Sequence, residues 1–418
     1  MRWTVLGVAV WIGVVPYVPL PAPYTGRWVA SISSEHLARL PAFPMDTSQW
    51  PVVKDARLLE AHYLPSAMKV LGAETVAAVS GSSDLAFLDR DGVLHISAGP
   101  DHTSLRSSQR IGLVGRPLGY VYDASGRLVI CDSVAGLLRY DANDGCTSGW
   151  ERTRTFCHSP RPANVPTSIP AVRAATTLLA NALQDGTPLR FVNALAISAA
   201  TGKIYFSSAS DQPVSWRGGD HLGENGFYDT MAAAKMNLVH GAPAGRLLVY
   251  DPTTRRVEVL LSDLFFANGV ALAPDESFVL VCETYGARVM RVWLKGPEAG
   301  QHEVFVDRLP GFPDGISKRE GGGYWISIVN PPNLLCRIAG PAPVRALLGH
   351  IMPLVEPVVK KIGCVAKVAA DGTREELLMD GKGNHVSSIA SAHQQGRKLY
   401  LGNLMGAGVS MLQLEEGE

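Results

Sequence analysis

The chain has 418 residues, and its 38 basic residues are balanced by 38 acidic ones, so the formal net charge is zero. Hydrophobic residues make up 46% of the sequence and charged residues 18%, with a mean hydropathy of +0.09. This composition allows a large core, excludes a disordered chain and argues against nucleic acid as the main partner. With 42 glycines, 28 prolines and little helical periodicity, an all-β fold is favoured.

The N-terminal segment differs from the rest of the chain. No charged residue occurs between Trp3 and Gly26, and Val5–Val15 is continuously apolar. This run is shorter than the roughly 20 residues that span a bilayer, and it has the length of a secretory signal. We expect residues 1–22 to be a retained signal anchor or a cleaved signal peptide, with a buried strand as the alternative. Either membrane interpretation makes the chain membrane-anchored or secretory, with the remainder lumenal or extracellular.

The cysteines fall into two kinds of surroundings. Cys131 and Cys282 lie in apolar strand-like runs, which indicates buried thiols. Cys146 and Cys157 lie in polar, turn-rich sequence, where a disulfide bond can close a surface loop if the compartment is oxidising. No Cys-x-x-Cys pair occurs, which excludes a zinc ribbon or a thioredoxin motif. Nucleophile-elbow, zinc-protease, phosphate-loop and dinucleotide-binding motifs are also absent.

A repeated unit is the strongest signal in the sequence. It consists of a short apolar strand, a turn rich in Asp, Pro or Gly, and a second apolar strand that ends in small polar residues. Examples are DLAFLDRDGVLHISAG, LGYVYDASGRLVICDS and NGVALAPDESFVLVCET. Six copies begin near Glu74, Pro117, Asn193, Asn268, Asp314 and Val386.

Further strands between these hairpins bring each unit to about four strands, which predicts a six-bladed β-propeller over residues 61–418. Residues 23–60 are expected to form an N-terminal extension. The C-terminal strand VSMLQL is expected to pair with strand material before Glu74, closing the ring so that no edge is left free.

Three insertions interrupt the repeat. Residues 150–190 contain a stretch with helical spacing (AVRAATTLLANAL), and residues 209–241 are polar and aromatic. Residues 341–362 also have helical apolar spacing. We expect the last of these to be a helix packed on the propeller, or alternatively a lid or a membrane-facing surface.

Polar residues stand at the start of several innermost strands, where the strands of a propeller converge on its axis. They are Glu74, Asn193, Asn268 and Asp314. Two carboxylates and two amides from separate blades form an oxygen-rich set of the kind that Ca²⁺ prefers, whereas zinc or copper would favour His or Cys. An Asn or Asp at a turn often only caps it, but four at the same phase of the repeat predict a metal site.

Long motifs around these residues resemble the strictosidine synthase-like family, which includes adipocyte plasma membrane-associated protein. They include ANGVALAPDESFVLVCETYGARVMRVWLKGP and EVFVDRLPGFPDGISKREGGGYWIS, and the resemblance covers roughly residues 50–415. It implies a six-bladed propeller similar to the calcium-dependent paraoxonase and gluconolactonase propellers. It also implies an N-terminal anchor, a loop disulfide such as Cys146–Cys157, and metal ligation by Glu74, Asn193, Asn268 and Asp314.

The sequence departs from its catalytic relatives at two places. Strictosidine synthases have a catalytic Glu after a strand that here reads YWISIVNPPN and contains no carboxylate. Paraoxonases have a His pair where this chain has Leu118 and Asp132. His221, His385 and His393 are interpreted as surface or satisfied histidines.

Three function classes are therefore considered. The first is a calcium-dependent hydrolase of small-molecule esters or lactones, with Asp314 as the catalytic residue beside the metal and a water as the attacking group. The second is a carbon–nitrogen condensing synthase, which the missing Glu disfavours. The third is a membrane-tethered propeller that acts as a binding or interaction module without chemistry.

Overall fold

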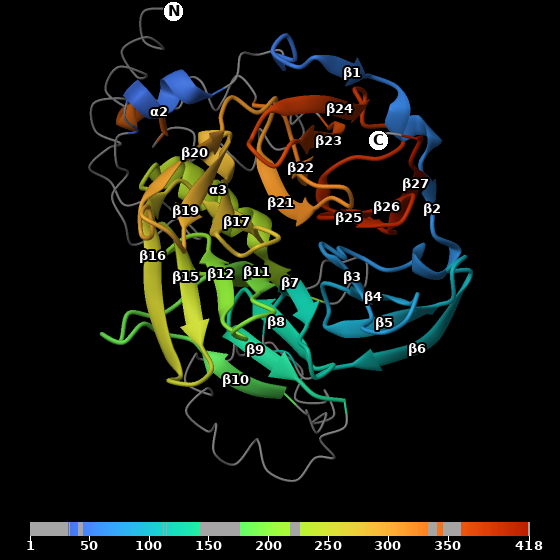
Figure 1. Cartoon of the computed structure of the whole chain (residues 1–418), viewed down its shortest axis with the longest axis horizontal. Helices are drawn as coiled ribbons and strands as arrows, with labels where there is room; N and C mark the ends of the chain where they lie inside the picture. The colour runs from blue at the N-terminus through green and yellow to red at the C-terminus, as the bar shows by residue number, and fades with distance from the viewer. Residues whose placement is uncertain are drawn as a thin grey trace, which may run out of the picture.

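The structure is a computed structural model that describes residues 32, 34–40, 45–111, 113, 115–142, 176–217, 226–332, 341–345 and 361–416. Six sheets, antiparallel except for one parallel edge strand, are arranged around a central axis as a six-bladed β-propeller (Figure 1). The predicted fold class is therefore confirmed. In each of the first four blades the strands follow one another in chain order outward from the axis.

Blades 1 to 3 come first in the chain order of their innermost strands and have four strands each. Blade 1 comprises β3 (Val76–Ala78), β4 (Leu85–Leu88), β5 (Val93–Ala98) and β6 (Ser104–Arg110). Blade 2 comprises β7 (Pro117–Tyr122), β8 (Leu128–Asp132), β9 (Gly136–Tyr140) and β10 (Thr176–Ala180). Blade 3 comprises β11 (Val192–Ile197), β12 (Ile204–Ser208), β15 (Gly245–Asp251) and β16 (Arg256–Leu264).

Blades 4 to 6 follow, and the last two each take an outer strand from the N-terminal part of the chain. Blade 4 comprises β17 (Ala267–Leu272), β18 (Phe278–Glu283), β19 (Arg288–Trp293) and β20 (His302–Val306). Blade 5 comprises β21 (Pro313–Lys318), β22 (Tyr324–Ile328), β23 (Gly363–Val368), β24 (Arg374–Asp380) and β1 (Val52–Lys54). Blade 6 comprises β25 (Ile389–Gln395), β26 (Lys398–Asn403), β27 (Ser410–Gln413) and β2 (His62–Tyr63).

The ring is closed by chain segments from both ends of the sequence. Strand β2 pairs antiparallel with β27, as the sequence predicted, with His62 opposite Met411 and Tyr63 opposite Ser410. Strand β1 pairs parallel with β24 on the neighbouring blade. The innermost strands β3, β7, β11, β17, β21 and β25 then contact one another in that cyclic order, and β25 returns to β3. The first residues of these strands consequently meet at one end of the axis.

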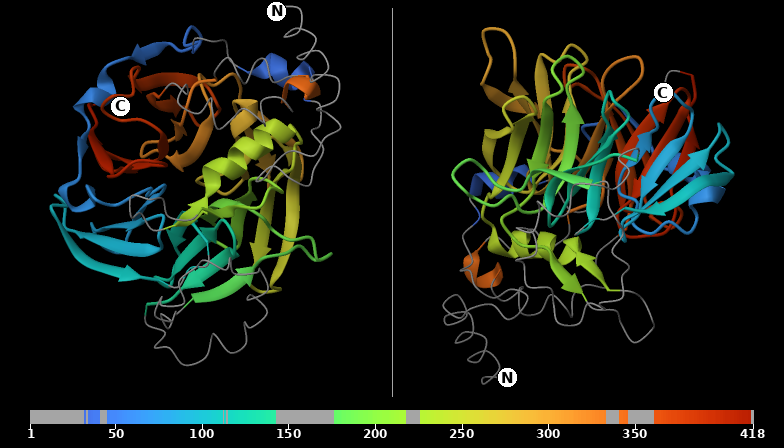
Figure 2. Two further views of the ribbon diagram at one scale, coloured as in Figure 1. Left: turned by 180° about the vertical axis from the view of Figure 1, so that it is seen from behind. Right: turned by 90° about the horizontal axis from the view of Figure 1, so that it is seen from below.

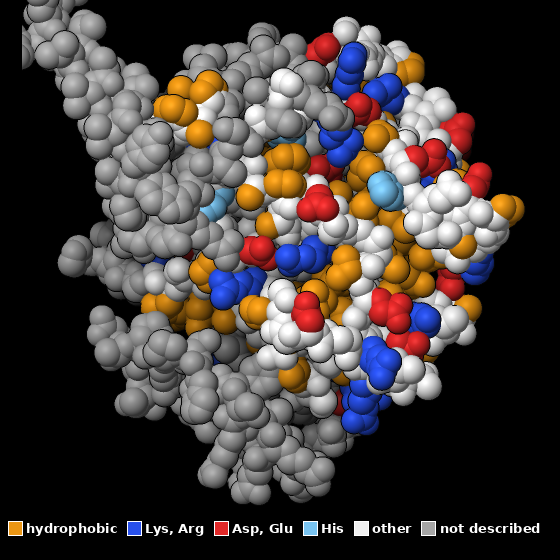
Figure 3. Space-filling model, turned by 90° about the vertical axis from the view of Figure 1, so that its left-hand side faces the viewer, with side chains coloured by type: hydrophobic (Ala, Val, Ile, Leu, Met, Phe, Trp, Pro, Cys, Tyr) orange, Lys and Arg blue, Asp and Glu red, His pale blue; other side chains and the backbone are white. Residues whose placement is uncertain are grey.

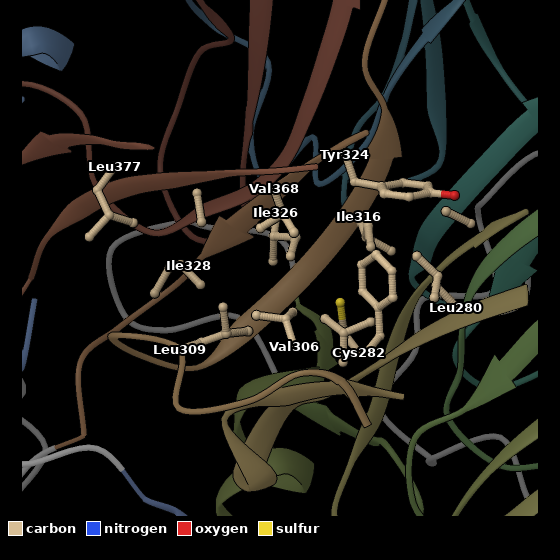
Figure 4. Packing of buried hydrophobic residues seen from close by; sticks show 14 of the residues in the cluster. Leu280, Cys282, Val306, Leu309, Ile316, Tyr324, Ile326, Ile328, Val368 and Leu377 are labelled. Atoms are coloured by element: carbon tan, nitrogen blue, oxygen red, sulfur yellow. The ribbon is translucent and has the colours of Figure 1, made fainter. Parts of the chain in front are cut away.

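Apolar side chains fill the spaces between adjacent blades. Figure 4 shows the cluster between blades 4 and 5, where Leu280 and Cys282 of β18 face Ile316, Ile326 and the strands beyond them. The two cysteines that the sequence assigned to the core, Cys131 and Cys282, are buried free thiols. Burial raises the pKa of both thiols well above the usual value, which makes them unreactive.

A separate layer covers the end of the axis where the innermost strands begin. It consists of β13 (Ser215–Arg217), β14 (Phe227–Asp229) and α3 (Thr230–His240), which lie within the insertion of blade 3, and we call this layer the lid. Figure 2 shows it standing out from one face of the propeller. The helix begins because the Asp229 side chain accepts a hydrogen bond from Ala232 N, and it ends at Gly241, whose φ is 64°.

Short helical elements complete the structure. They are α2 (Ser34–Arg39) and the 3₁₀ turns η2 (Arg57–Glu60), η3 (Pro65–Ala67) and η5 (Thr284–Gly286), and residues 342–345 are also helical. Within the parts of the chain that the structure describes, no helix is both long enough and apolar enough to cross a membrane. The expected anchor at residues 1–22, Cys146, Cys157, His221 and most of the helix expected at 341–362 lie outside the described residues.

Two assignments from the sequence were wrong. The stretch interpreted as a helix near 171–183 forms strand β10 over Thr176–Ala180, because this segment completes the outer edge of blade 2 by pairing with β9. The segment DLAFLDRDGVLHISAG, interpreted as an inner hairpin, forms the second and third strands of blade 1. Its innermost strand is the three-residue β3, which is too short to be recognised by alternation.

Charges of both signs are interspersed on the outer surface. On the face in Figure 3, acidic and basic side chains alternate with apolar ones, without a large area of one sign. This distribution agrees with the zero formal net charge of the sequence. The described part of this face therefore offers no extended electrostatic attraction for a polyanion.

The interblade core leads to a stability prediction. Val368 of β23 is fully buried between blades 4 and 5, and Val304 of β20 is 40% exposed. Val368→Ala should lower the free energy of unfolding by about 2 kcal/mol or more, because it removes buried methyl groups and leaves a cavity. Val304→Ala should change it by about 0.5 kcal/mol or less. Urea unfolding followed by circular dichroism measures both; equal effects would contradict this packing.

Candidate functional site

The four residues predicted to bind a metal lie at the same end of the axis, beneath the lid. Glu74 lies just before β3, separated from its first residue Val76 by Thr75, and Asn193, Asn268 and Asp314 are the second residues of β11, β17 and β21. Their exposed fractions are 6%, 3%, 5% and 3% in that order, so all four are buried. The equivalent residues of the other two innermost strands are Leu118 and Ala390, which make the rest of the ring apolar at this level.

A β-bulge orients three of these side chains. In blade 5 Pro313 pairs with Ile328, but Ile316 pairs with Ile326, so the innermost strand has one residue more than its partner. The same shift occurs around Asn193 in blade 3 and around Asn268 in blade 4. A bulge bends a strand and redirects the side chains within it, which here places the polar residue of each strand at the axis.

Buried serines compensate for the hydrogen bonds that two of the bulges remove. Ser327 Oγ accepts from Gly315 N at 2.9 Å and donates to Ala390 O at 2.7 Å. Ser207 Oγ accepts from Ala194 N at 3.0 Å in blade 3. Each serine satisfies the amide that follows the axial residue, which fixes the backbone on which Asp314 or Asn193 is mounted.

Glycine follows Leu118, Asn268 and Asp314 because neighbouring innermost strands approach closely there. A Cβ on Gly315 would lie 2.5 Å from Ala390 O, and a Cβ on Gly119 would lie 2.7 Å from Asn193 O. Gly269 likewise lies against the backbone of Asp314 and Ile316. These contacts explain the Asn-Gly and Asp-Gly pairs of the sequence by close backbone approach rather than by turn formation.

The two carboxylates influence each other's protonation. Burial raises the pKa of Glu74 to about 7, against the opposing effect of the Arg116 charge. Burial also raises the pKa of Asp314 well above its usual value, and the charge of Glu74 raises it further, while a hydrogen bond donated by Asn268 and the charge of Arg116 lower it. Two negative charges are therefore unfavourable here unless a cation or a proton compensates them.

Arg116 is a site residue that the sequence interpretation missed. It is 3% exposed, and it donates from Nη1 to Thr230 Oγ1 at 2.9 Å and from Nη2 to Leu404 O at 2.6 Å. Its guanidinium thus connects blade 2 to the first residue of the lid helix and to blade 6, close to both carboxylates. The available signal was a charged residue directly before Pro117, where an innermost strand begins.

The lid packs on the same end of the axis through apolar contacts. Ala233 and Ala234 of α3 form an apolar cluster with residues that lie at or next to the starts of three innermost strands, namely Leu118, Phe191 and Phe266. The other members of the cluster are Ala209 and Val214, and the partly buried residues packed against it are Val134, Tyr228 and Tyr285. Two polar contacts add to this packing: Tyr285 OH donates to Ala234 O at 2.8 Å, and the Arg90 guanidinium lies over the Phe227 ring at 4.5 Å. The lid therefore shields the carboxylates from bulk water.

The residues present fit a hard divalent cation. Glu74 Oε2 is buried and has no hydrogen-bond partner among the described residues, which is the condition expected of an oxygen that awaits a ligand. Within the described residues, no group of three or more His, Cys, Asp or Glu side chains lies together, so the amides Asn193 and Asn268 would have to contribute oxygens. Carboxylate and amide oxygens are ligands that Ca²⁺ accepts.

The other positions singled out in the sequence have structural roles. Leu118 is part of the cluster under the lid, and Asp132 accepts hydrogen bonds from Gly115 N, Val134 N and Ala135 N, which shape a turn. His385 N donates to Asp380 and its ring contacts Ala61 O. His393 on β25 differs from the expected surface or satisfied histidine: burial lowers its pKa, and its Nε2 is buried without a hydrogen-bond partner among the described residues.

Comparison with known proteins identifies relatives of this chain. The family described as Strictosidine synthase matches residues 226–297. The chain is 30% identical over 309 residues to adipocyte plasma membrane-associated protein of Rattus norvegicus, covering 72% of this chain and 70% of that protein. It is 29% identical over 307 residues to the strictosidine synthase-like 10 protein of Arabidopsis thaliana, covering 70% and 67%. The matched region spans only 64% of the Mus musculus homologue.

Solved structures of the same fold share little sequence with the chain. A gluconolactonase of Xanthomonas campestris has a TM-score of 0.52 at 17% identity, covering 86% of this chain and 92% of that one. Regucalcin of Agrobacterium tumefaciens, described as a calcium-binding protein, has a TM-score of 0.52 at 14% identity, covering 87% and 96%. At these identities the likeness establishes the propeller fold alone.

The raised pKa of Glu74 leads to a prediction for the protein in excess chelator. Because the folded pKa of about 7 exceeds the ordinary 4.5, the native state binds the proton more tightly than the unfolded state does. This contribution to stability is complete below about pH 4.5 and is lost as the pH rises through 7. Between pH 5 and pH 8 the free energy of unfolding of the wild type should therefore fall by about 1 to 3 kcal/mol more than that of Glu74→Gln.

Urea unfolding at several pH values measures this difference. Asp371→Asn is the control, because Asp371 is an exposed turn residue whose hydrogen bonds go to Thr373 within the same turn. Its pH profile should remain that of the wild type. Parallel profiles for wild type and Glu74→Gln would contradict the electrostatic description of the axis.

Proposed function

The chain belongs to the strictosidine synthase-like family, and we propose that it is a calcium-dependent hydrolase of esters or lactones. The observation that supports this most directly is the buried pair Glu74 and Asp314, with the amides of Asn193 and Asn268 on the innermost strands between them. Arg116 provides one positive charge against two carboxylates. A bound dication would compensate them fully, and it would use the unpartnered Glu74 Oε2.

The fold neighbours support the same chemistry only by analogy. One is described as a gluconolactonase and another as a calcium-binding protein, and both are propellers of the same architecture. A propeller can host unrelated functions, so the proposal depends on the axial residues of this chain rather than on the neighbours' names.

In the proposed mechanism, Glu74, Asn193, Asn268 and Asp314 would hold the ion. A calcium ion held there would supply polarisation of the ester or lactone carbonyl and would make the attacking water more acidic. The lid excludes bulk water, which strengthens every electrostatic interaction at the axis. The attacking water forms a bond to the carbonyl carbon and gives its proton to the Asp314 carboxylate. Asp314 then returns that proton to the leaving oxygen as the carbon–oxygen bond breaks.

A second candidate function is a binding or interaction module without chemistry, tethered to a membrane by its N-terminal segment. One observation favours it: the positions of the paraoxonase His pair hold Leu118, which is in the apolar cluster, and Asp132, which is committed to a turn. The relatives named for a plasma membrane association agree with a membrane location in this proposal.

Calcium binding can be tested without a substrate. If the four axial residues bind calcium, the ion should raise the melting temperature, because a ligand that binds only the native state stabilises it by about 2.7 kcal/mol at 100 times its Kd. Glu74→Gln should weaken this shift, whereas Asp371→Asn should leave it unchanged. Differential scanning calorimetry in chelator and in millimolar calcium measures the effect. An identical melting curve in both conditions would argue against the metal site.

Hydrolysis requires a second experiment. Asp314→Asn keeps the shape of the side chain but removes its charge and its capacity to accept a proton, so it should abolish turnover of aryl esters and lactones. The fold should persist, as judged by circular dichroism, and Asp371→Asn should retain full activity. Full activity in Asp314→Asn would move the chemistry elsewhere in the chain. If the calcium-loaded wild type hydrolyses no member of a broad ester and lactone panel, the interaction module becomes the better proposal.

A further inference from the structure

Thr284 connects two of the axial residues. It follows β18 as the first residue of η5 and is 7% exposed. Its Oγ1 donates to Pro313 O at 2.8 Å and accepts from Asn268 Nδ2 at 3.3 Å. Its backbone N–H is held separately by Phe266 O at 3.0 Å. The hydroxyl therefore bridges blade 4 to the residue that directly precedes Asp314 in blade 5.

The hydrogen atoms at this bridge determine which way the Asn268 amide faces. A threonine hydroxyl has one proton, and here it goes to Pro313 O, a carbonyl that can only accept. The oxygen of Thr284 thus offers a lone pair to Asn268, which must turn its NH₂ group toward it. The second hydrogen of that NH₂ group is donated to the Asp314 carboxylate. With both amide hydrogens engaged, the carbonyl oxygen Oδ1 is the atom left for a ligand.

The fold itself does not require a hydroxyl at this position. The residue equivalent to Thr284 in blade 3 is Ala209, whose N–H donates to Phe191 O, and in blade 5 it is Val329, whose N–H donates to Phe312 O. These blades make the same bulge and the same backbone hydrogen bond with an apolar side chain. The Thr284 hydroxyl of blade 4 is thus not needed to form the bulge or the backbone hydrogen bond. Its own hydrogen bonds go to the Asn268 amide and to Pro313 O.

We propose that Thr284 is a positioning residue that orients Asn268 so that Oδ1 faces the axis as a metal ligand. This inference rests on the proposed function, since it assumes a calcium ion among the axial residues. Hydrogen-bonding partners of metal ligands commonly change metal affinity by about 10- to 100-fold when they are removed. Thr284→Val keeps the shape of the side chain and removes the hydroxyl, so it should weaken calcium binding by a factor in this range.

The test is isothermal titration of calcium into wild type, Thr284→Val, Thr284→Ser and Thr284→Ala. Thr284→Ser keeps the hydroxyl and should bind calcium as the wild type does. Thr284→Ala reproduces the residue found in blade 3, and it provides a second hydroxyl-free variant if Thr284→Val folds poorly. Asn268→Ala and the double variant Asn268→Ala/Thr284→Val complete a double-mutant cycle. Once the amide is removed, Thr284→Val should cause no further loss of affinity.

The outcomes separate this inference from the proposed function. If the wild type binds no calcium, the metal site and this inference both fail. If the wild type binds calcium and both hydroxyl-free variants bind it equally well, only the role of Thr284 is overturned. The role of Thr284 would also be overturned if Thr284→Val reduced calcium affinity equally with and without the Asn268 amide. Thr284 would then act on the fold rather than through Asn268. The inference would be supported by three results together: weaker calcium binding in Thr284→Val, wild-type calcium binding in Thr284→Ser, and no weaker binding in the double variant than in Asn268→Ala.

Discussion

Two carboxylates, Glu74 and Asp314, are buried in one ring of strands, and the electrostatic cost of burying them accounts for the organisation of this end of the propeller. Arg116 places a guanidinium beside them, and Asn268 donates a hydrogen bond to one of them. The lid lies over the same end and is attached there through Thr230. Where water is excluded, the repulsion between the two carboxylates costs more if no cation is present. For the same reason, the attraction between the carboxylates and a bound cation is stronger.

The backbone geometry of the site is a modification of the blade itself. A bulge near the start of an innermost strand leaves an amide without its partner on the second strand. In each of four blades, one residue of the second strand faces the bulge. This residue is a serine in blade 3 (Ser207) and blade 5 (Ser327), and a buried cysteine in blade 2 (Cys131) and blade 4 (Cys282). A small side chain is needed there because the neighbouring blade packs against it. The two cysteines thus belong to the architecture of the axis, although they take no part in its chemistry.

Much of this arrangement could be predicted from the sequence, for identifiable reasons. The repeated hairpins and their turns specified six blades, and the shared phase of Glu74, Asn193, Asn268 and Asp314 predicted that these residues lie at one end of the axis. Arg116 was missed because it precedes its strand and reaches the axis only through a long side chain. The lid helix was missed because the polar insertion obscured it, although Asp229 and Gly241 are suitable capping residues. The contacts of Thr284 depend on two blades and have no pattern in the sequence.

The attachment of the N-terminal segment has a mechanical consequence. This segment first pairs with the outer edge of blade 5 through β1 and then with the outer edge of blade 6 through β2. Tension applied to the chain before Val52 therefore reaches the parallel β1–β24 pairing first, and it reaches the β2–β27 pairing that closes the ring only after β1 has detached. Lys54 reinforces the first of these attachments, because its Nζ lies 3.0 Å from Glu376 and 3.1 Å from Glu415. Tension on the N-terminal side of the propeller is thus borne first by β1, before the strand pair that closes the ring is loaded.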